Sequence, residues 1–169
     1  MVKIASNFLD TVTFRTVVEH TPLVAIDLIV QNEAGEVLLG LRRNRPAQGF
    51  WFVPGGRVRK NETLDAAFMR LTETELGQCI TRDCAKFIGV YEHLYTDSVF
   101  DNSDSNTTTS THYVVLGYRL LFSQANSQAL PLDQHDCFRW WTTSEVQADS
   151  QVHDNSRAYL SALVPNTYE

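Results

Sequence analysis

The clearest hydrophobic pattern in the chain lies between Thr63 and Gly77. Its apolar positions recur at the spacing of one helix face: Leu64, Ala67, Phe68 and Leu71. Thr63 is suited to cap the first turn of a helix, and Gly77 is suited to end the last one. The pattern therefore predicts an amphipathic helix over Leu64 to Leu76, with one apolar face turned toward the core.

Several runs of β-branched and apolar residues predict strands. They are Leu23 to Val30, Val37 to Leu41, Phe50 to Val53, Ala85 to Leu94, Thr111 to Phe122 and Phe138 to Trp141. The sequence NEAGE predicts a hairpin between the first two runs, and PGG predicts a tight turn after the third. Further helices are expected over Lys3 to His20 and Asn155 to Leu163. Strands mixed with a few helices predict an α+β fold, arranged as an α/β/α sandwich.

The domain organisation follows from the length and from the absence of a linker. A chain of 169 residues fits one domain, and we expect residues 1–169 to form it. Residues 96–111 have the sequence TDSVFDNSDSNTTTST, which is rich in Asp, Ser, Asn and Thr. Such a loop is either a solvated connection or a lid over a site.

The charge of the chain narrows the classes of ligand. A formal net charge of -6 argues against nucleic-acid binding by bulk electrostatics. An anionic ligand would therefore need a local cluster of basic residues. Such a cluster is present in the sequence at Arg42, Arg43, Arg45 and Arg57.

The compartment can also be predicted from composition. No apolar run approaches the ~20 residues that span a bilayer, and the N-terminus lacks the apolar segment of a signal peptide. We expect a cytoplasmic protein with no membrane partner. The three cysteines are odd in number and form no C-x-x-C pair, which favours reduced thiols over disulfides or a zinc site.

One carboxylate falls on the apolar face of the central helix. Continuing the stripe by four residues from Leu71 leads to Glu75. A buried carboxylate requires an arginine, backbone N–H donors or a metal ion. The alternative is that the helix frays before Gly77 and that Glu75 reaches water. Glu62 and Arg70 are likewise either part of a site or an ordinary solvated pair.

The residues from Gly56 to Gly77 resemble the Nudix box. Gly56, Glu62, Arg70, Glu75 and Gly77 match its fixed positions at the required spacings, directly after a strand and a Pro-Gly-Gly turn. The resemblance implies a Nudix fold with a mixed β-sheet. It also implies metal-dependent hydrolysis of a nucleotide.

The sequence departs from the box at two acidic positions, which hold Leu71 and Thr74. Thr72 and Gln78 also replace its aliphatic residues. Several carboxylates on one helix suit two or more cations and attack of water at phosphorus. With Glu75 as the main remaining acid, a single metal that neutralises a diphosphate leaving group is favoured.

Further segments resemble one branch of the family, the GDP-mannose mannosyl hydrolases. They are TPLVAIDLIV, NRPAQGFWFVPGGR, THYVVLGYR, DQHDCFRWW and HDNSRAYL. The resemblance implies hydrolysis of GDP-mannose, and of GDP-glucose, to GDP and the free sugar. Water would attack the anomeric carbon with inversion, with one Mg²⁺ per active site, for which Mn²⁺ can substitute. It further implies a homodimer.

The resemblance also assigns site residues, position by position. The metal ligands are the carbonyl of Gly55 and the side chains of Glu75 and Gln134, and His135 is the general base. Arg42 and Arg57 match the arginines that bind the diphosphate and assist its departure. Asp27 and Tyr113 match further substrate-binding positions. His93 is a separate candidate for substrate binding, because it lies at the end of a predicted strand and near the long loop.

These roles agree with general chemistry. A metal and two guanidiniums stabilise the charge that develops on a departing diphosphate. A neutral imidazole whose pKa lies near the working pH can take a proton from water.

Each candidate has a plain alternative. Asp27, in a strand that is apolar on both faces, could pair with an arginine. Tyr113 could be a core aromatic, and His135 a solvated loop residue. The competing functions are a pyrophosphohydrolase that cleaves a nucleoside diphosphate sugar at phosphorus and a non-catalytic module that binds nucleotide-sugars.

Overall fold

A computed structural model describes residues 9–101, 109–122, 130–132 and 135–163. Its elements, in chain order, are α1 (Thr11–His20), β1 (Leu23–Gln31), β2 (Val37–Arg42), β3 (Trp51–Phe52), β4 (Gly55–Arg57), α2 (Leu64–Leu76), the 3-10 helix η1 (Arg82–Cys84), β5 (Lys86–Tyr95), β6 (Thr111–Leu121), β7 (His135–Trp141), α3 (Thr143–Ala148), α4 (Asp154–Arg157) and the 3-10 helix η3 (Ala158–Ala162). None of these helices is long and apolar enough to cross a membrane.

The sheet is mixed. Its strand order is β3-β2-β1-β6-β5, with β4 paired to β1 and β7 paired to β2. Strands β1 and β6 run parallel along the whole of β1, and the other pairs are antiparallel. This arrangement confirms the expected α+β class and the mixed sheet.

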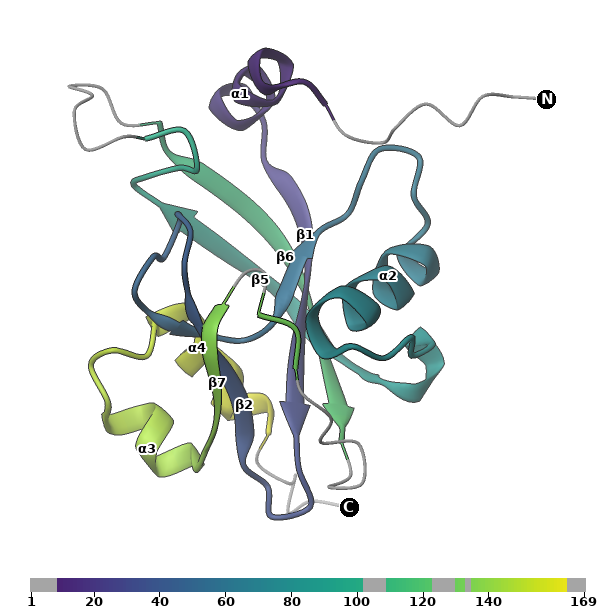
Figure 1. The fold of residues 1–169 in the computed structure, drawn as a ribbon, viewed down its shortest axis with the longest axis vertical. Coiled ribbons are helices and arrows are strands. Elements are labelled where there is room, and N and C mark those ends of the chain that lie inside the picture. Colours follow the sequence, from purple (N-terminus) through teal and green to yellow (C-terminus); the bar gives the residue numbers. More distant parts are fainter. Residues whose placement is uncertain (1–8, 102–108, 123–129, 133–134, 164–169) are drawn as a thin grey trace.

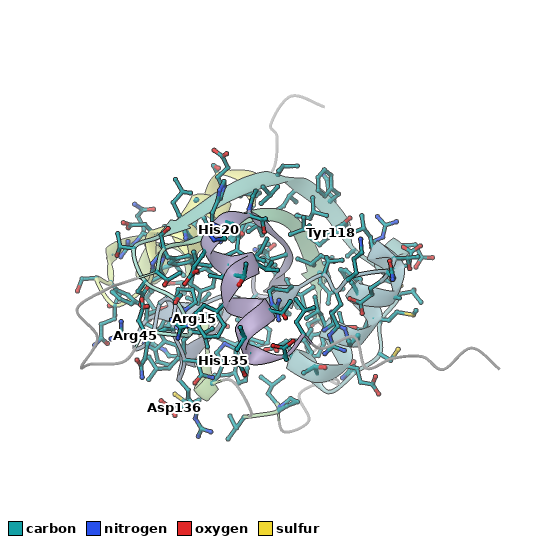
Figure 2. The ribbon with its side chains drawn as sticks, turned by 90° about the horizontal axis from the view of Figure 1, so that it is seen from above. Arg15, His20, Arg45, Tyr118, His135 and Asp136 are labelled. Atoms are coloured by element: carbon teal, nitrogen blue, oxygen red, sulfur yellow. The ribbon has the colours of Figure 1, made fainter. Side chains whose placement is uncertain are left out.

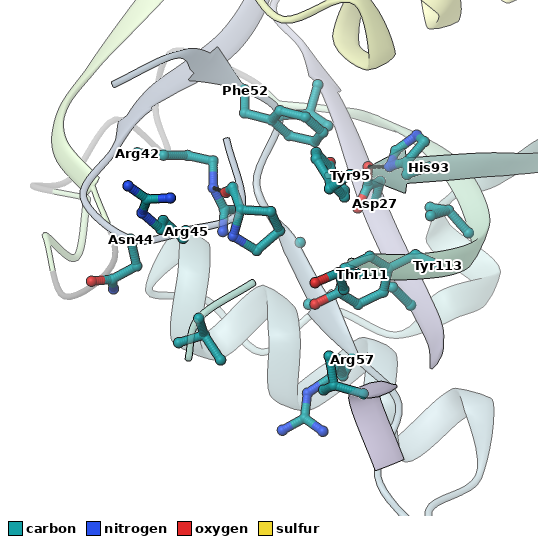
Figure 3. Close-up of a pocket in the computed structure, with 18 of the residues that line it drawn as sticks. Asp27, Arg42, Asn44, Arg45, Phe52, Arg57, His93, Tyr95, Thr111 and Tyr113 are labelled. Atoms are coloured by element: carbon teal, nitrogen blue, oxygen red, sulfur yellow. Dashed lines mark hydrogen bonds and ion pairs between the residues drawn. The ribbon is translucent and has the colours of Figure 1, made fainter. Parts of the chain in front are cut away.

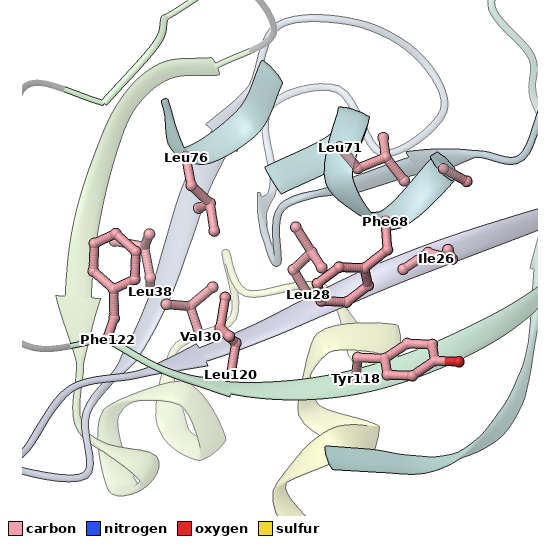
Figure 4. Close-up of a cluster of buried hydrophobic side chains, with 11 residues drawn as sticks. Ile26, Leu28, Val30, Leu38, Phe68, Leu71, Leu76, Tyr118, Leu120 and Phe122 are labelled. Atoms are coloured by element: carbon pink, nitrogen blue, oxygen red, sulfur yellow. The ribbon is translucent and has the colours of Figure 1, made fainter. Parts of the chain in front are cut away.

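Two hydrophobic cores lie on opposite faces of the sheet because side chains alternate along β1. Ile26, Leu28 and Val30 pack with α2, which crosses one face (Figure 4). Ile29 packs with residues of α3 and η3 on the other face. In Figure 1, α2 and the α3–α4 pair accordingly lie on opposite sides of the strands, as the α/β/α prediction required.

Helix α2 has the predicted bounds. The Thr63 hydroxyl accepts a hydrogen bond from the Ala66 N–H at 3.2 Å, and Gly77 ends the helix with a positive φ of 71°. At Thr72, where the Nudix box has an aliphatic residue, the buried hydroxyl accepts from the Ile80 N–H at 3.0 Å. This hydrogen bond satisfies a polar group that would otherwise be costly inside the core.

The predicted PGG turn is wrong in part. Residues Gly55–Arg57 form β4, which pairs with β1 in the register Asp27↔Gly55 and Ala25↔Arg57. Glycine is required at position 55, where a Cβ would come within 2.6 Å of the Asp27 Oδ1 atom. The turn therefore leads at once into a short strand beside the centre of the sheet.

The terminal helices differ from the predicted ones. Helix α1 begins at Thr11, because the Asp10 carboxylate accepts hydrogen bonds from the N–H groups of Val12 and Thr13. The part of that prediction before Leu9 lies outside the described residues. The last predicted helix is divided into α4 and the 3-10 helix η3. Helix α3, with a capping box between Thr142 and Glu145, was not predicted.

The predicted hairpin is confirmed at its turn, where Gln31 pairs with Val37. Beyond that point β2 pairs with β7 and β3. Helix α1 lies over one end of the sheet, as the end-on view in Figure 2 shows. Because β1, β4 and β6 all reach this end, α1 forms one wall of the cavity described below.

Candidate functional site

A cavity of about 280 Å³ opens beside the middle of β1 (Figure 3). It is walled by residues of α1, β1, β3, β4, β5 and β6 and by the segment after β2. Six residues predicted from the sequence line it: Asp27, Arg42, Gly55, Arg57, His93 and Tyr113. The fold thus brings together side chains that lie up to 86 positions apart, from Asp27 to Tyr113.

The two predicted arginines are held by different means. Arg42, at the end of β2, donates from Nε to the Pro46 carbonyl at 3.0 Å. Arg57, at the end of β4, places its guanidinium 3.8 Å from the ring centroid of Phe14 in α1. Within the described part of the chain, neither guanidinium pairs with a carboxylate. Both are available to an anionic ligand.

The ion pair of Glu62 and Arg70 supports the backbone of Arg57 at the wall of the cavity. Arg70 donates to both Glu62 oxygens, at 2.6 and 2.8 Å, and also to the Arg57 carbonyl at 2.9 Å. The two side chains are 9% and 23% exposed, so the alternative of a solvated pair is wrong. Arg70 lowers the pKa of Glu62 by hydrogen bonding to its charged form.

Asp27 lies at the inner wall of the cavity and is only 6% exposed. Its hydrogen-bond partner is the Tyr159 hydroxyl, which donates to Oδ2 at 2.8 Å, and not an arginine. Burial raises the pKa of Asp27 to about 7, against the opposing effects of Tyr159 and Arg42. An arginine ion pair is therefore not the reason for this buried acid.

His93 and Tyr113 flank Asp27 at the cavity. The Nδ1 atom of His93 lies 3.9 Å from Oδ2 of Asp27, and burial lowers the pKa of His93 to about 4. Burial raises the pKa of Tyr113, while Arg57 and Arg42 act in the opposite direction. Tyr113 thus lines the site beside the two arginines instead of filling a core.

Glu75 and His135 form a second buried group, outside the lining of that cavity. Both side chains are 3% exposed, and Oε2 of Glu75 lies 3.7 Å from Nδ1 of His135. Glu75 is part of regular helix, so the alternative of a frayed end that reaches water is wrong. Arg42 connects the Glu75–His135 pair to the cavity, because its backbone pairs with His135 while its side chain lines the cavity.

The expectation that His135 titrates near neutral pH is wrong. It is the first residue of β7, not a solvated loop residue, and its ring packs 4.7 Å from that of Phe138. Burial, with a further contribution from Arg42, lowers its pKa to about 4. The imidazole is consequently in its neutral form at pH 7.

The altered box positions have structural consequences. Leu71 is buried in the core against Gly56, where a Cβ would come within 2.7 Å of its side chain, and Thr74 is exposed. Glu75 follows Leu71 by one helical turn and lies on the same face. Nowhere among the described residues do three or more His, Cys, Asp or Glu side chains cluster as a metal site. Gln134, the remaining predicted ligand, lies outside the described residues.

The sequence did not indicate several residues of the cavity or its support. Phe14 and Tyr95 were assigned no role, although both line it. Tyr159 supports Asp27 from a segment 132 positions away. The only signal for Tyr159 was the motif HDNSRAYL, and a tyrosine in a terminal helix is usually a core residue.

Comparisons with known proteins bear on the family and the fold. A family model described as the NUDIX domain matches residues 21–163. A relative from Haloferax volcanii, called low-salt glycan biosynthesis protein Agl8, is 41% identical over 113 residues, 67% of this chain and 67% of the relative. An ADP-ribose pyrophosphatase from Methanocaldococcus jannaschii is 34% identical over 70 residues, which cover 41% of this chain and only 40% of that protein.

A solved structure has the same fold. The MutT NUDIX hydrolase from Burkholderia pseudomallei superimposes with a TM-score of 0.64 at 23% identity, over 86% of this chain and 100% of that one. The superposition supports the fold, and the family model confirms the resemblance to the Nudix box.

Proposed function

The chain belongs to the NUDIX hydrolase family, and from this premise we propose that it hydrolyses GDP-mannose or GDP-glucose to GDP and the free sugar. In this proposal water attacks the anomeric carbon and the configuration inverts. The observation that carries the proposal is the acid content of α2. Glu75 is its buried carboxylate, and the positions of two further acids of the box hold a buried Leu71 and an exposed Thr74.

The number of buried carboxylates on α2 bears on whether the substrate is cleaved at phosphorus or at carbon. Attack at phosphorus is assisted by several cations that clamp both the entering and the leaving oxygen. A helix with one buried carboxylate is poorly equipped to hold such a cluster. It is suited to a single cation that stabilises a departing diphosphate, as cleavage at carbon requires.

The residues present fit such a cation by their chemistry. The Glu75 carboxylate and the Gly55 carbonyl are hard oxygen donors of the type that Mg²⁺ prefers, and Gln134 would add a third. His135 beside Glu75 is neutral and therefore does not repel a cation. Mg²⁺, when bound, would neutralise charge on the diphosphate. Mn²⁺ would serve the same purpose.

The arginines of the cavity would bind the diphosphate end of the substrate. Arg42 and Arg57 reach the cavity from two strands, so their guanidiniums can contact different phosphate oxygens. Each planar guanidinium offers paired donors to such oxygens. As the glycosyl bond breaks, negative charge grows on the β-phosphate, and fixed positive groups stabilise that change.

The remaining residues would act on the sugar and on water. His135, neutral at pH 7, has a free lone pair with which to accept a proton from the attacking water. Asp27, His93 and Tyr113 would contact sugar hydroxyls or the adjoining phosphate from the inner wall of the cavity.

The two relatives favour different candidate functions. The name of the Haloferax protein refers to glycan biosynthesis, which agrees with a sugar-containing substrate. The name of the Methanocaldococcus protein refers to a pyrophosphatase, which favours the second candidate, cleavage at phosphorus. Product analysis by phosphorus NMR tests the proposal. We expect GDP and free sugar from GDP-mannose with Mg²⁺, whereas GMP and mannose 1-phosphate would establish the second candidate.

A further inference from the structure

Tyr159 is a buried residue that does not line the cavity yet contacts two residues that do. It belongs to η3, and 1% of it is exposed. Gly117, which pairs with Asp27 across β1 and β6, leaves room for its ring, since a Cβ there would lie 3.3 Å from Tyr159 Cε1. The ring of Tyr91 packs against it at 4.5 Å between centroids. The ring of Tyr159 is therefore held on several sides.

The hydroxyl of Tyr159 joins two polar residues of the inner wall, Asp27 and His93. It donates to Oδ2 of Asp27 at 2.8 Å and lies 3.3 Å from Nε2 of His93. A phenol has one hydrogen to donate, and Asp27 receives it. The contact with His93 is then a hydrogen bond only if Nε2 carries the proton and donates to the tyrosine oxygen.

This arrangement determines which atoms of Asp27 and His93 can bind a ligand. Oδ2 of Asp27 is engaged by Tyr159, and Oδ1 lies beside the space that a Cβ at Gly55 would fill. If the proton of His93 is at Nε2, Nδ1 is a bare acceptor, 3.9 Å from Oδ2. Both residues line the cavity, whereas Tyr159 lies behind them.

We propose that Tyr159 is a positioning residue, whose hydroxyl fixes the orientation of the Asp27 carboxylate and the Nε2–H tautomer of His93 toward the sugar of the substrate. The role toward a sugar rests on the proposed function. The fixed tautomer rests on the hydrogen bonds alone, so the two parts can be tested separately.

A purely structural role for Tyr159 predicts a different outcome. In that case the ring contributes packing, and the hydroxyl only provides a hydrogen bond to the buried Asp27 carboxylate. Tyr159→Phe keeps the ring and removes the hydroxyl, and therefore separates the two roles. Tyr91→Phe is the matched control, because Tyr91 packs against the same ring and has no part in the hydrogen bonds to Asp27 or His93.

The first measurement is ¹⁵N NMR of the His93 ring above pH 8. The wild type and Tyr91→Phe should show the Nε2–H tautomer. In Tyr159→Phe the Nε2–H loses its acceptor, and the fraction of the Nδ1–H tautomer should rise, because Nδ1 faces the Asp27 carboxylate at 3.9 Å. An unchanged tautomer in Tyr159→Phe overturns the proposal, whatever happens to activity.

The second measurement is steady-state hydrolysis of GDP-mannose. Misplaced sugar contacts should lower kcat/KM by about 10- to 100-fold in Tyr159→Phe. The affinity for GDP, which depends on Arg42 and Arg57, should change less than about twofold. Equal losses in Tyr159→Phe and Tyr91→Phe would contradict positioning. If the wild type does not hydrolyse the substrate, the proposed function fails, and the NMR result still decides the role of Tyr159.

Discussion

The carboxylate of Glu75 and the imidazole of His135 face each other inside the protein, with 3.7 Å between Oε2 and Nδ1. They come from α2 and β7, elements that are distant in sequence. Because burial lowers the pKa of His135 to about 4, the ring is neutral at pH 7 and does not form a charged pair with Glu75. The proposed base and the proposed metal ligand can therefore be adjacent without neutralising each other's charge.

Replacing His135 by Gln should depress turnover while preserving ligand binding. A positioned general base contributes about 10²- to 10⁴-fold to rate, so kcat should fall within that range. The affinity for GDP, measured by calorimetry, should stay within about twofold. His20→Gln, at the exposed end of α1, is the control and should retain activity. Activity close to wild type at neutral pH in His135→Gln would remove His135 as the base.

Glu75→Gln should weaken Mg²⁺ binding and lower turnover together. The amide keeps the size of the side chain and removes the charge that attracts Mg²⁺. A Mg²⁺ titration of activity should move to higher concentration by about tenfold or more, with a lower plateau. The matched control is Glu73→Gln, an exposed carboxylate of the same helix. If the two variants titrate alike, Glu75 is not a ligand.

Arg57→Gln should reduce GDP affinity and kcat/KM by about 10- to 100-fold, because a fixed guanidinium contact to the diphosphate is lost. Arg43→Gln provides the comparison. Arg43 is half exposed and pairs with Asp136, outside the lining of the cavity. Its removal should leave the GDP Kd unchanged in calorimetry. Comparable losses from both substitutions would mean that the effect is one of overall charge.

Glu62→Gln should destabilise the protein by about 1–2 kcal/mol at pH 7, because Arg70 loses its charged partner. Arg70 holds the pKa of Glu62 below 4.5. The contribution of the Glu62–Arg70 ion pair to stability is therefore complete above about pH 4.5. It is lost as the pH falls through the lowered pKa of Glu62 in the folded protein. Urea denaturation at pH 7 and pH 3 should show a difference between wild type and variant that shrinks in acid.

Asp65→Asn is the control for that experiment. Asp65 pairs with Arg82 at an exposed position, so its removal should cost less than about 0.5 kcal/mol. A constant difference between wild type and Glu62→Gln at both pH values would contradict the assigned role of the ion pair.

Features set by neighbouring residues could be predicted from the sequence. The bounds of α2 followed from the cap at Thr63, the apolar stripe and Gly77, all of which act within a few residues. The start of helix α1 is another feature set by a neighbouring residue, but the sequence prediction missed it. Its start is set by the local cap Asp10, a signal that was present and was not used.

Features set by distant contacts could not be predicted in the same way. Strand β4 exists because Gly55 pairs with Asp27, and the sequence PGG by itself indicates a turn. Tyr159 supports Asp27 across 132 positions, which no local pattern encodes. The lowered pKa of His135 results from packing in β7, where the sequence indicated a loop.

The position of bond cleavage is tested most directly by hydrolysis of GDP-mannose in ¹⁸O-water with Mg²⁺. The products are separated and the label is located by mass spectrometry. Attack at the anomeric carbon predicts the label in the free sugar and unlabelled GDP. Label in GMP or in mannose 1-phosphate would mean attack at phosphorus and would contradict the central claim.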